Sequence, residues 1–540
     1  MTKRLWLLGL LAIVVLAAAL RLHGIRDPIV DHPGWRQGDT AAIARNFARL
    51  QYDPMHPQTM YNGPPPNYVE LELQIVPFLA ATLYKLFGVK VIFGRLIVLA
   101  FSLGTIVTIA YFARWLFGSS PAGSIASFFY AVFPGSIYYG RTFMPDTAMV
   151  FFLTAALFAT ARYLTCDRLS PRQLAYATAL LTLAYLAKPV SVLALVPVVA
   201  LIVARYIARR PAAVWQISIL IALPLLVLWL YDRRVASYAE WHWASGITQL
   251  HVLPALRAAF TGPSAFLAKL GQLRVVFGLL RATMLGALGF LLSVAAFIAS
   301  PWAGARSKAL LWGWLAGALA YAYVVVTVER VDYYLYPFLP LCALAIGGAL
   351  GRAAASVWAA DVAPAARYAL LAVIPALGAA VLVQSPPAIA AYYSYNPQAY
   401  QNAVALDGAL PQGALVVIGH YGPDVQYYID RFGWEEDPYL WTPFDEESAI
   451  AKGARYFISI EDGRLRRNLE LCAWLARFPV VSGPDRWPIY QTDPARILPN
   501  AESFWRAFRR AERAGAGRDF LDSRGVCVTP ANPTPSATTR

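Results

Sequence analysis

Residues 92–113 read IFGRLIVLAFSLGTIVTIAYFA, and this stretch contains a single charged side chain. An apolar helix of roughly 20 residues is long enough to cross the hydrocarbon core of a bilayer. Similar apolar stretches recur along the first 385 residues, beginning with residues 5–20, LWLLGLLAIVVLAAAL. A large soluble protein with buried helices does not repeat that length so often. The recurrence therefore predicts an integral membrane protein with many transmembrane helices.

The composition indicates the same class of protein. Of 540 residues, 58% are hydrophobic and 14% are charged, whereas soluble domains carry roughly 25% charged residues. The mean hydropathy is +0.48. In a soluble protein a net charge of +15 would indicate a nucleic-acid partner, but in a membrane protein Lys and Arg gather at cytoplasmic helix ends. We therefore expect membrane lipids and no nucleic acid as partners.

The spans and their flanking charges predict an orientation. Lys3 and Arg4 precede the first apolar stretch, which we interpret as an uncleaved signal anchor with a cytoplasmic N-terminus. The segment Gln74–Phe87 is too short to cross and is assigned to the first external loop as an interfacial or re-entrant segment. With 11 spans in all, the arginine-rich loops fall on the cytoplasmic side. The further spans are expected near 92–113, 122–138, 147–164, 173–187, 190–207, 213–231, 276–299, 309–327, 333–350 and 366–384.

The chain divides into a membrane module and a smaller domain. The module is expected over 1–384, with external loops at 23–91 and 232–275. Short β-like runs then alternate with helical runs, which predicts an extracytoplasmic α/β domain over 385–527. The β-like runs are Ala414–Gly419, Tyr456–Ile460 and Val480–Ser482, and the helical runs are Pro423–Asp430 and Leu465–Arg477. The Pro/Thr/Ser-rich tail 528–540 is predicted to be disordered.

The four cysteines are scattered, without metal-ligand spacing. Cys472 and Cys527 both lie in the C-terminal domain and form a disulfide if this domain is exported; two unpaired thiols are the alternative. No Asp-x-Asp or His/Asp cluster indicates a metal. We therefore predict neither a metal site nor a cofactor.

The first external loop carries a candidate acid. Arg36 and Asp39 are three residues apart at the expected start of an amphipathic helix, AAIARNFARL, so they can share one helix face. The spacing alone favours Asp39 as an N-cap. A carboxylate at this position is also suited to deprotonate an acceptor hydroxyl as a general base. Both interpretations stay open.

The same loop continues as YNGPPPNYVELEL. Three consecutive prolines impose an extended, rigid segment, which delivers Tyr68, Glu70 and Glu72 to the membrane face. A helix would separate the two glutamates and a strand would align them. Interfacial carboxylates without a specific role are the alternative interpretation.

Further charges are expected at the external ends of the spans, where an ionisable group near hydrocarbon is usually functional. Arg141 and Asp146 either form a structural ion pair, or Arg141 binds an anion. Lys188 either extends toward the interface or binds a lipid phosphate. An aromatic belt explains tyrosines at the last junction but not the charges beside them. The candidates at that junction are Arg330, Asp332, Tyr333 and Tyr334. Together these clusters suit a site for a membrane-bound phosphate and a polar acceptor.

In their order along the chain, these motifs resemble the bacterial relatives of the protein O-mannosyltransferases and of the aminoarabinose transferases that modify lipid A. Those proteins have the GT-C architecture and use polyprenyl-phosphate sugars. The resemblance covers about residues 1–345. It rests on WRQGDTAAIARNF at 35–47, YKLFG at 84–88, Arg141 with Asp146, Leu-Ala-Lys-Pro at 186–189 and Asp-Tyr-Tyr-x-x-Pro-x-x-Pro at 332–340.

The resemblance implies an inverting glycosyltransferase of the inner or plasma membrane, acting at the extracytoplasmic face. A sugar would pass from a polyprenyl-phosphate donor to a hydroxyl of a lipid, glycan or protein. Asp39 matches the acid proposed to activate the acceptor, and Glu72 and Asp146 are further candidate catalytic carboxylates. Lys188, Arg141 and Arg330 are candidates for the donor phosphate, with Arg36, Tyr68, Glu70, Asp332, Tyr333 and Tyr334 as further substrate-binding candidates.

The sequence departs from these relatives at three places. Arg36 and Gln37 stand where many relatives have Asp-Glu, so Asp39 is a shifted equivalent or no equivalent, with Asp31 and Glu72 as substitutes. The Lys-Pro-Pro of the aminoarabinose branch is replaced by the run at 63–66, GPPP, which argues against that route of lipid A modification. The Trp-Trp-Asp signature of the oligosaccharyltransferases is missing.

Two other functions compete with the transferase. The first is a transporter or flippase of lipid-linked substrates; such proteins bind near the bilayer midplane and often show repeated halves, whereas here the charges gather at one face. The second is a non-catalytic membrane assembly factor whose C-terminal domain recruits partners.

Overall fold

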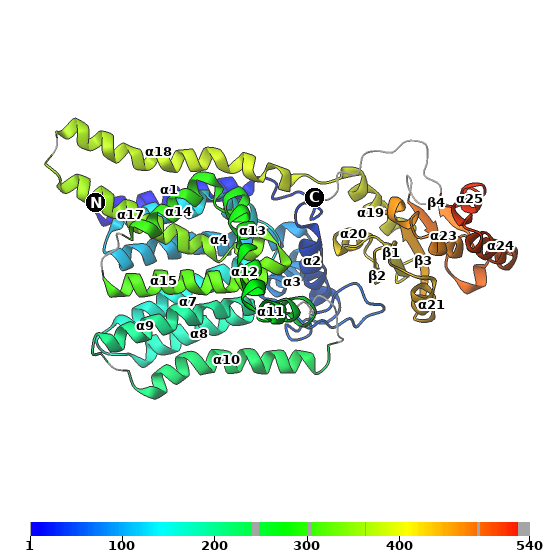
Figure 1. Ribbon diagram of the computed structural model, residues 1–540, viewed down its shortest axis with the longest axis horizontal. Coiled ribbons are helices and arrows are strands. Elements are labelled where there is room, and N and C mark those ends of the chain that lie inside the picture. The colour runs from blue at the N-terminus through cyan, green and yellow to red at the C-terminus, as the bar shows by residue number, and fades with distance from the viewer. Residues whose placement is uncertain are drawn as a thin grey trace. The chain divides into compact units, whose positions relative to one another are not determined.

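The computed structural model describes residues 2–210, 212–239, 248–300, 304–361, 363–482 and 487–527. It is mostly helical, with one small sheet near the C-terminus (Figure 1). The chain forms two compact units. Their limits differ from the predicted boundary between residues 384 and 385. The first unit comprises Met1–Asp27, Phe47–Pro57 and Val69–Ser394. The second comprises Pro28–Asn46, Gln58–Tyr68 and Tyr395–Arg540, so it takes parts of the first predicted loop.

Within the described residues of the first unit, eight helical segments are long and apolar enough to cross a membrane. Their length and apolar composition confirm a polytopic helical membrane protein. The segments are Lys3–Leu22 (α1), Val91–Phe117 (α4), Asp146–Thr165 (α7), Pro189–Ile207 (η1 and α9), Val214–Ala236 (α10), Ala305–Glu329 (α15, η4 and α16), Phe338–Ala359 (α17) and Pro364–Tyr393 (α18 and η6).

The other three predicted spans coincide with shorter helices. One is interrupted after α5 (Ser120–Val132), where Pro134 starts the short helix α6 (Pro134–Tyr139). Another reduces to α14 (Gly286–Ala299), because Gly286 adopts a φ of +73° that a continuous helix excludes. The third is α8 (Pro171–Ala187), which ends before Lys188-Pro189. The remaining helices of this unit are α3 (Ile75–Phe87), α11 (Leu253–Ala259), α12 (Pro263–Gly271) and α13 (Leu273–Leu279), with the single-turn segments η2 (Thr248–Val252), η3 (Leu280–Met284) and η5 (Asp332–Leu335).

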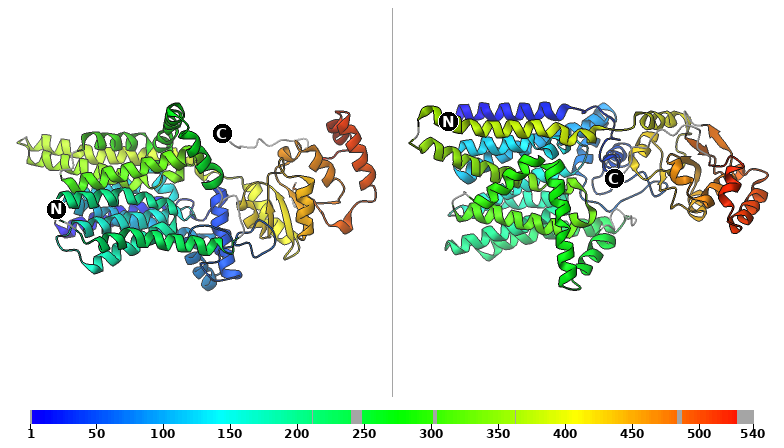
Figure 2. Two further views of the ribbon diagram at one scale, coloured as in Figure 1. Left: turned by 60° about the horizontal axis from the view of Figure 1, so that its bottom comes forward. Right: turned by 45° about the horizontal axis from the view of Figure 1, so that its top comes forward.

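Small residues let the helices of this unit pack closely. The long helices run side by side in Figures 1 and 2. A methyl group on Gly347 of α17 would lie 2.5 Å from the Cβ atom of Ala126 on α5. Close approach of helix backbones through small residues replaces the hydrophobic driving force that is missing inside a bilayer.

One charge is fully enclosed by the bundle. The Arg21 guanidinium, 0% exposed, donates hydrogen bonds to the hydroxyls of Ser102 and Ser136 at 2.8 and 2.7 Å. It also donates to the carbonyls of Ala17 and Ala131 at 3.0 and 3.1 Å. These acceptors compensate the desolvation that makes a charge costly among apolar helices.

The second unit contains a five-stranded sheet in the order β2-β1-β3-β5-β4. Strand β1 pairs in parallel with β2 and β3, and β5 pairs antiparallel with β3 and β4. This mixed sheet confirms the predicted α/β architecture, and all three predicted β-like runs are strands. The strands are β1 (Leu415–Gly419), β2 (Gly433–Glu435), β3 (Ala454–Ser459), β4 (Val480–Ser482) and β5 (Pro488–Tyr490).

The helices of the second unit cover this sheet. They are α2 (Gly34–Arg49, of which residues up to Asn46 belong here), α19 (Pro397–Ala409), α20 (Pro423–Ile429), α21 (Pro443–Ala451), α22 (Asp462–Leu465), α23 (Leu469–Leu475), α24 (Ala501–Arg513) and α25 (Gly517–Asp522). Helix α20 occupies the predicted run Pro423–Asp430. The predicted tail 528–540 lies outside the described residues.

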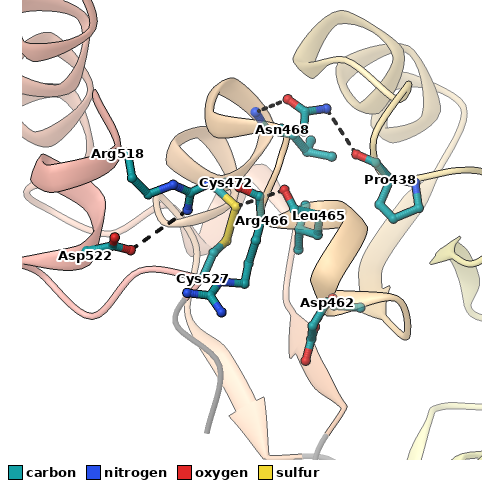
Figure 3. The surroundings of a disulfide bond; sticks show 11 residues. Pro438, Asp462, Leu465, Arg466, Asn468, Cys472, Arg518, Asp522 and Cys527 are labelled. Carbon is teal, nitrogen blue, oxygen red and sulfur yellow. Dashed lines mark hydrogen bonds and ion pairs between the residues drawn. A yellow bond between two sulfur atoms is a disulfide. The ribbon is translucent and has the colours of Figure 1, made fainter. Parts of the chain in front are cut away.

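A disulfide joins α23 to the segment that follows α25 (Figure 3). The Cα atoms of Cys472 and Cys527 are 6.0 Å apart, within the range of natural disulfides. Of the two alternatives left by the sequence, the bonded one is therefore found. Beside it, the Asn468 side chain accepts the backbone N–H of Leu471 at the start of α23. Cys166 and Cys342 are free thiols.

Candidate functional site

Helix α2 carries the acid predicted from the first loop. It begins at Gly34, directly after Pro33, so Asp39 lies well inside the helix. The prediction of Asp39 as an N-cap is therefore wrong, because the helix already starts at Gly34 and not after Asp39. Arg36 and Asp39 do share one helix face, as their spacing predicted: the Arg36 Nη1 atom lies 3.3 Å from Asp39 Oδ2.

The Asp39 carboxylate is fully buried and held from two sides. Arg36 contacts one oxygen, and the Tyr61 hydroxyl donates a hydrogen bond to the other at 2.9 Å. Burial, together with the nearby Asp39 carboxylate, raises the pKa of Tyr61 well above its ordinary value. The Tyr61 phenol therefore stays protonated and donates its hydrogen bond to Asp39. The rival acid Asp31, also buried, accepts a hydrogen bond from Gln37 at 2.6 Å.

A second group of predicted residues meets in the first unit around Lys188. The Lys188 Nζ atom lies 2.5 Å from Asp146 Oδ1, at the first residue of α7. It also lies 5.4 Å and 4.8 Å from the ring centroids of Tyr333 and Tyr334. The ion partner of Asp146 is therefore Lys188, and the predicted pair of Arg141 with Asp146 is not formed. Two rings and one carboxylate fix an ammonium group at the end of α8.

Asp332 belongs to the same neighbourhood. Its carboxylate accepts hydrogen bonds from the hydroxyls of Tyr139 at 2.6 Å, Tyr392 at 2.5 Å and Thr283 at 3.1 Å. The ring of Tyr139 in turn lies 6.0 Å from that of Tyr333, edge to face. Asp332 therefore anchors the wall of aromatic rings beside Lys188.

The other predicted cations differ in their surroundings. Arg141 is fully buried, donates to the carbonyl of Gly24 at 3.1 Å and lies over the rings of Tyr138 and Tyr393 at 4.8 and 4.6 Å. Arg330 is exposed and adopts a φ of +52° where α16 ends. The structure thus places Arg141 within the bundle and Arg330 on the surface.

The segment with Glu70 and Glu72 adopts neither helix nor strand. The backbone N–H of Leu73 donates to the carbonyl of Leu186 at 2.9 Å, two residues before Lys188. Partial burial and the neighbouring Asp232 carboxylate raise the pKa of Glu70 above its ordinary value. Tyr68 belongs to the second unit, where it forms an isolated bridge with Gln58. Within the first unit, the structure therefore brings Leu73, which follows Glu72, to the end of α8 near Lys188.

Sequence patterns did not indicate the hydrogen-bond donors of these acids. Tyr61, Tyr392 and Thr283 were missed because each meets its carboxylate only through the fold. Tyr139 stands two positions before the candidate Arg141, and this proximity in the sequence was the available signal. Among the described residues, no group of three or more His, Cys, Asp or Glu side chains could hold a metal ion.

Comparisons with known proteins identify the fold of the chain. The sequence model described as dolichyl-phosphate-mannose-protein mannosyltransferase matches residues 74–231. ArnT from Cupriavidus metallidurans, bound to undecaprenyl phosphate, has a similar structure, with a TM-score of 0.62, 14% identity, and coverage of 92% of this chain and 100% of that chain. The chain has the GT-C fold. The resemblance to GT-C glycosyltransferases inferred from the motifs is thus confirmed.

Two archaeal structures share the GT-C fold with this chain. The apo oligosaccharyltransferase of Archaeoglobus fulgidus has a TM-score of 0.62 and 12% identity, covering 92% of this chain and 76% of that chain. The oligosaccharyltransferase AglB from the same organism, in complex with an inhibitory peptide and a dolichol-phosphate, has a TM-score of 0.54 and 15% identity, covering 91% and 75%. No curated protein sequence matches the chain significantly.

Proposed function

We propose that this protein transfers a sugar from a polyprenyl-phosphate donor to an acceptor hydroxyl at the extracytoplasmic face of the membrane, with inversion. The observation that carries the proposal is the buried Asp39 carboxylate, held by Arg36 and Tyr61. The family match over 74–231 supports the sugar chemistry. The polyprenyl phosphates bound by two proteins of the same fold support the class of donor.

In the proposed reaction, the acceptor oxygen forms a bond to the anomeric carbon while the bond from that carbon to the phosphate oxygen breaks. Asp39 takes the proton of the acceptor hydroxyl, which makes the oxygen a stronger nucleophile. Polyprenyl phosphate leaves with the bonding electron pair, and its growing negative charge is stabilised by Lys188. Tyr333 and Tyr334 keep the ammonium group in place.

The acid is tested by amide substitutions. Membranes that carry D39N, supplied with labelled polyprenyl-phosphate sugars, should lose transfer by about 10²- to 10⁴-fold, the range of general-base catalysis. D53N is the matched control, because Asp53 lies in the same predicted loop and pairs with His56 at 2.7 Å. Near-normal transfer by D39N, with loss in D31N or E72Q, would move the base to that carboxylate. Movement of the donor across the bilayer without any glycosylated product would support the transporter instead.

A further inference from the structure

Helix α2 is bound to helix α20 of the C-terminal domain by a buried arginine. Arg45, 4% exposed, lies on α2 two turns after Asp39. Its Nη1 atom donates to the carbonyl of Tyr427 at 2.8 Å and lies 3.1 Å from Asp430 Oδ1. The guanidinium also stacks over the Tyr427 ring, 4.2 Å from its centroid. Three different contacts therefore fix this turn of α2 against the end of α20.

The two helices also touch near the other end of α20. A methyl group on Gly38 would lie 2.4 Å from both the Cα and the backbone nitrogen of Asp424, so the two backbones approach as closely as glycine allows. Gly38 directly precedes Asp39. The acid is therefore bracketed along α2 by two contacts with one helix of the C-terminal domain.

The hydrogen-bond donor to Asp39 is held by the same domain. Tyr61 lies in the segment 58–68, which joins the free edge of β2. The Gly433 N–H donates to the carbonyl of Met60 at 3.1 Å, and the Gly63 N–H donates to the carbonyl of Gly433 at 2.8 Å. The Gln426 side-chain amide adds a hydrogen bond to Met60 at 3.1 Å. Both the acid and its donor are thus attached to the second unit.

A buried acid of the sheet interacts electrostatically with Asp39. Glu435, at the end of β2, is 5% exposed and accepts the Gly422 N–H at 2.5 Å. Burial and the neighbouring Glu436 carboxylate, with a further contribution from Asp39, raise the pKa of Glu435 well above its ordinary value. The raised pKa favours the protonated form of Glu435, which repels the Asp39 carboxylate less than a second carboxylate would.

We propose that the C-terminal domain positions Asp39, the proposed catalytic base. Arg45 is the positioning residue that fixes α2 on α20. The inference rests on the proposed function and gives the domain a part in the reaction. Holding a reacting group in its productive geometry contributes strongly to rate, and a displacement of about 1 Å can reduce the rate about 10²-fold. Loss of Arg45 should therefore reduce turnover rather than donor binding.

The test compares R45M with R49M, an exposed arginine one turn later on the same helix. In full-length protein, R45M should lower kcat by about 10- to 100-fold with an unchanged KM for the donor, whereas R49M should match wild type. R45K should restore part of kcat, because it keeps the charge but not the paired contacts. Hydrogen–deuterium exchange over residues 34–46 should rise in R45M and not in R49M.

A second variant keeps the proposal testable if R45M does not fold. D430N removes only the charge facing Arg45, and Asn tolerates the φ of +53° at this position. It should lower kcat in the same direction as R45M, but by a smaller factor. Wild-type kcat in both R45M and D430N, or a change confined to the donor KM, would overturn the positioning role. D39N assayed in parallel separates the two proposals: if D39N keeps transfer, the proposed base itself is wrong.

Discussion

Lys188, the proposed phosphate-binding residue, already forms an ion pair with Asp146. Asp146 already neutralises the ammonium at 2.5 Å, and both side chains are largely buried. A phosphate that binds there meets this pair and two aromatic rings, not an isolated cation. Removing one partner of a buried pair leaves the other charge uncompensated, which costs more than removing both. The two residues should therefore behave as one unit in kinetic experiments.

We expect K188M to lower kcat/KM for the donor by about 10²-fold, in line with the cost of truncating one member of a buried charge pair. The double variant K188M/D146N should lose little more than K188M alone, because neutralising Asp146 removes the stranded charge. Kinetics of K188M, D146N and the double variant in membrane vesicles measure this coupling. K90M is the control, an exposed lysine at the start of α4. Strictly additive losses would show that the two residues act separately.

At this scale the sequence indicates which residues carry charge but not which ones meet. Arg36 and Asp39 were paired correctly, since a spacing of three sets the distance on a helix. For Asp146 the sequence left open an ion pair with nearby Arg141, whereas the ion partner in the structure, Lys188, lies 42 positions away. Tyr61 was not predicted as the donor to Asp39 because 22 positions separate them, including the irregular chain that follows α2.

Helix α21 contains a carboxyl group that the surrounding element keeps neutral. Glu446 is 0% exposed, and one of its oxygens accepts the indole N–H of Trp441 at 2.8 Å. Burial raises its pKa to about 8 from an ordinary value of 4.5. The native state therefore holds a proton that the unfolded chain loses at lower pH. The resulting stabilisation is complete below about pH 4.5 and is lost as the pH rises through 8.

E446Q imitates the protonated form and should abolish this pH dependence. At pH 8, the amides of α21 should exchange with deuterium at least about tenfold more slowly in E446Q than in wild type, since one pKa unit corresponds to a tenfold change in equilibrium. At pH 5 the two proteins should differ much less. E447Q is the control, because the Glu447 side chain is exposed on the same helix. Equal exchange in wild type and E446Q at both pH values would contradict a protonated Glu446.

Elements were predicted best where local pattern determines them. The strands at 414–419, 456–460 and 480–482 were identified from short apolar runs between turn residues, and each coincides with a strand of the sheet. The start of α2 was placed too late, because Gly34 to Gly38 carry no apolar periodicity. In the structure this turn is helical, and Gly38 closely approaches the backbone of Asp424. The continuous apolar pattern of 276–299 likewise did not indicate the break at Gly286, where α14 begins.

At the scale of the whole chain, the sequence did not indicate which segments belong to which compact unit. Arg45 and Tyr427 are separated by 382 positions, yet their contact places part of the first loop in the C-terminal unit. Neither the periodicity of apolar residues nor the spacing of motifs can predict a contact between residues so far apart in the sequence. The spans, by contrast, follow from apolar length alone, which is a local property.

The proposed orientation puts the free thiol of Cys166 on the cytoplasmic side of the membrane and the Cys472–Cys527 disulfide on the opposite side. Cys166 ends α7 beside Arg168 and Arg172, which the positive-inside rule assigns to the cytoplasm. The Cys472–Cys527 disulfide requires an oxidising compartment. In right-side-out vesicles, a membrane-impermeant maleimide should therefore label Cys527 only after reduction, and Cys166 only after permeabilisation. Substituting each cysteine with serine assigns the signals, and buried Cys342 should stay unlabelled throughout. Labelling of Cys166 in sealed vesicles would reverse the orientation and place the α7–α8 connection outside, which would refute an extracytoplasmic position for Asp39.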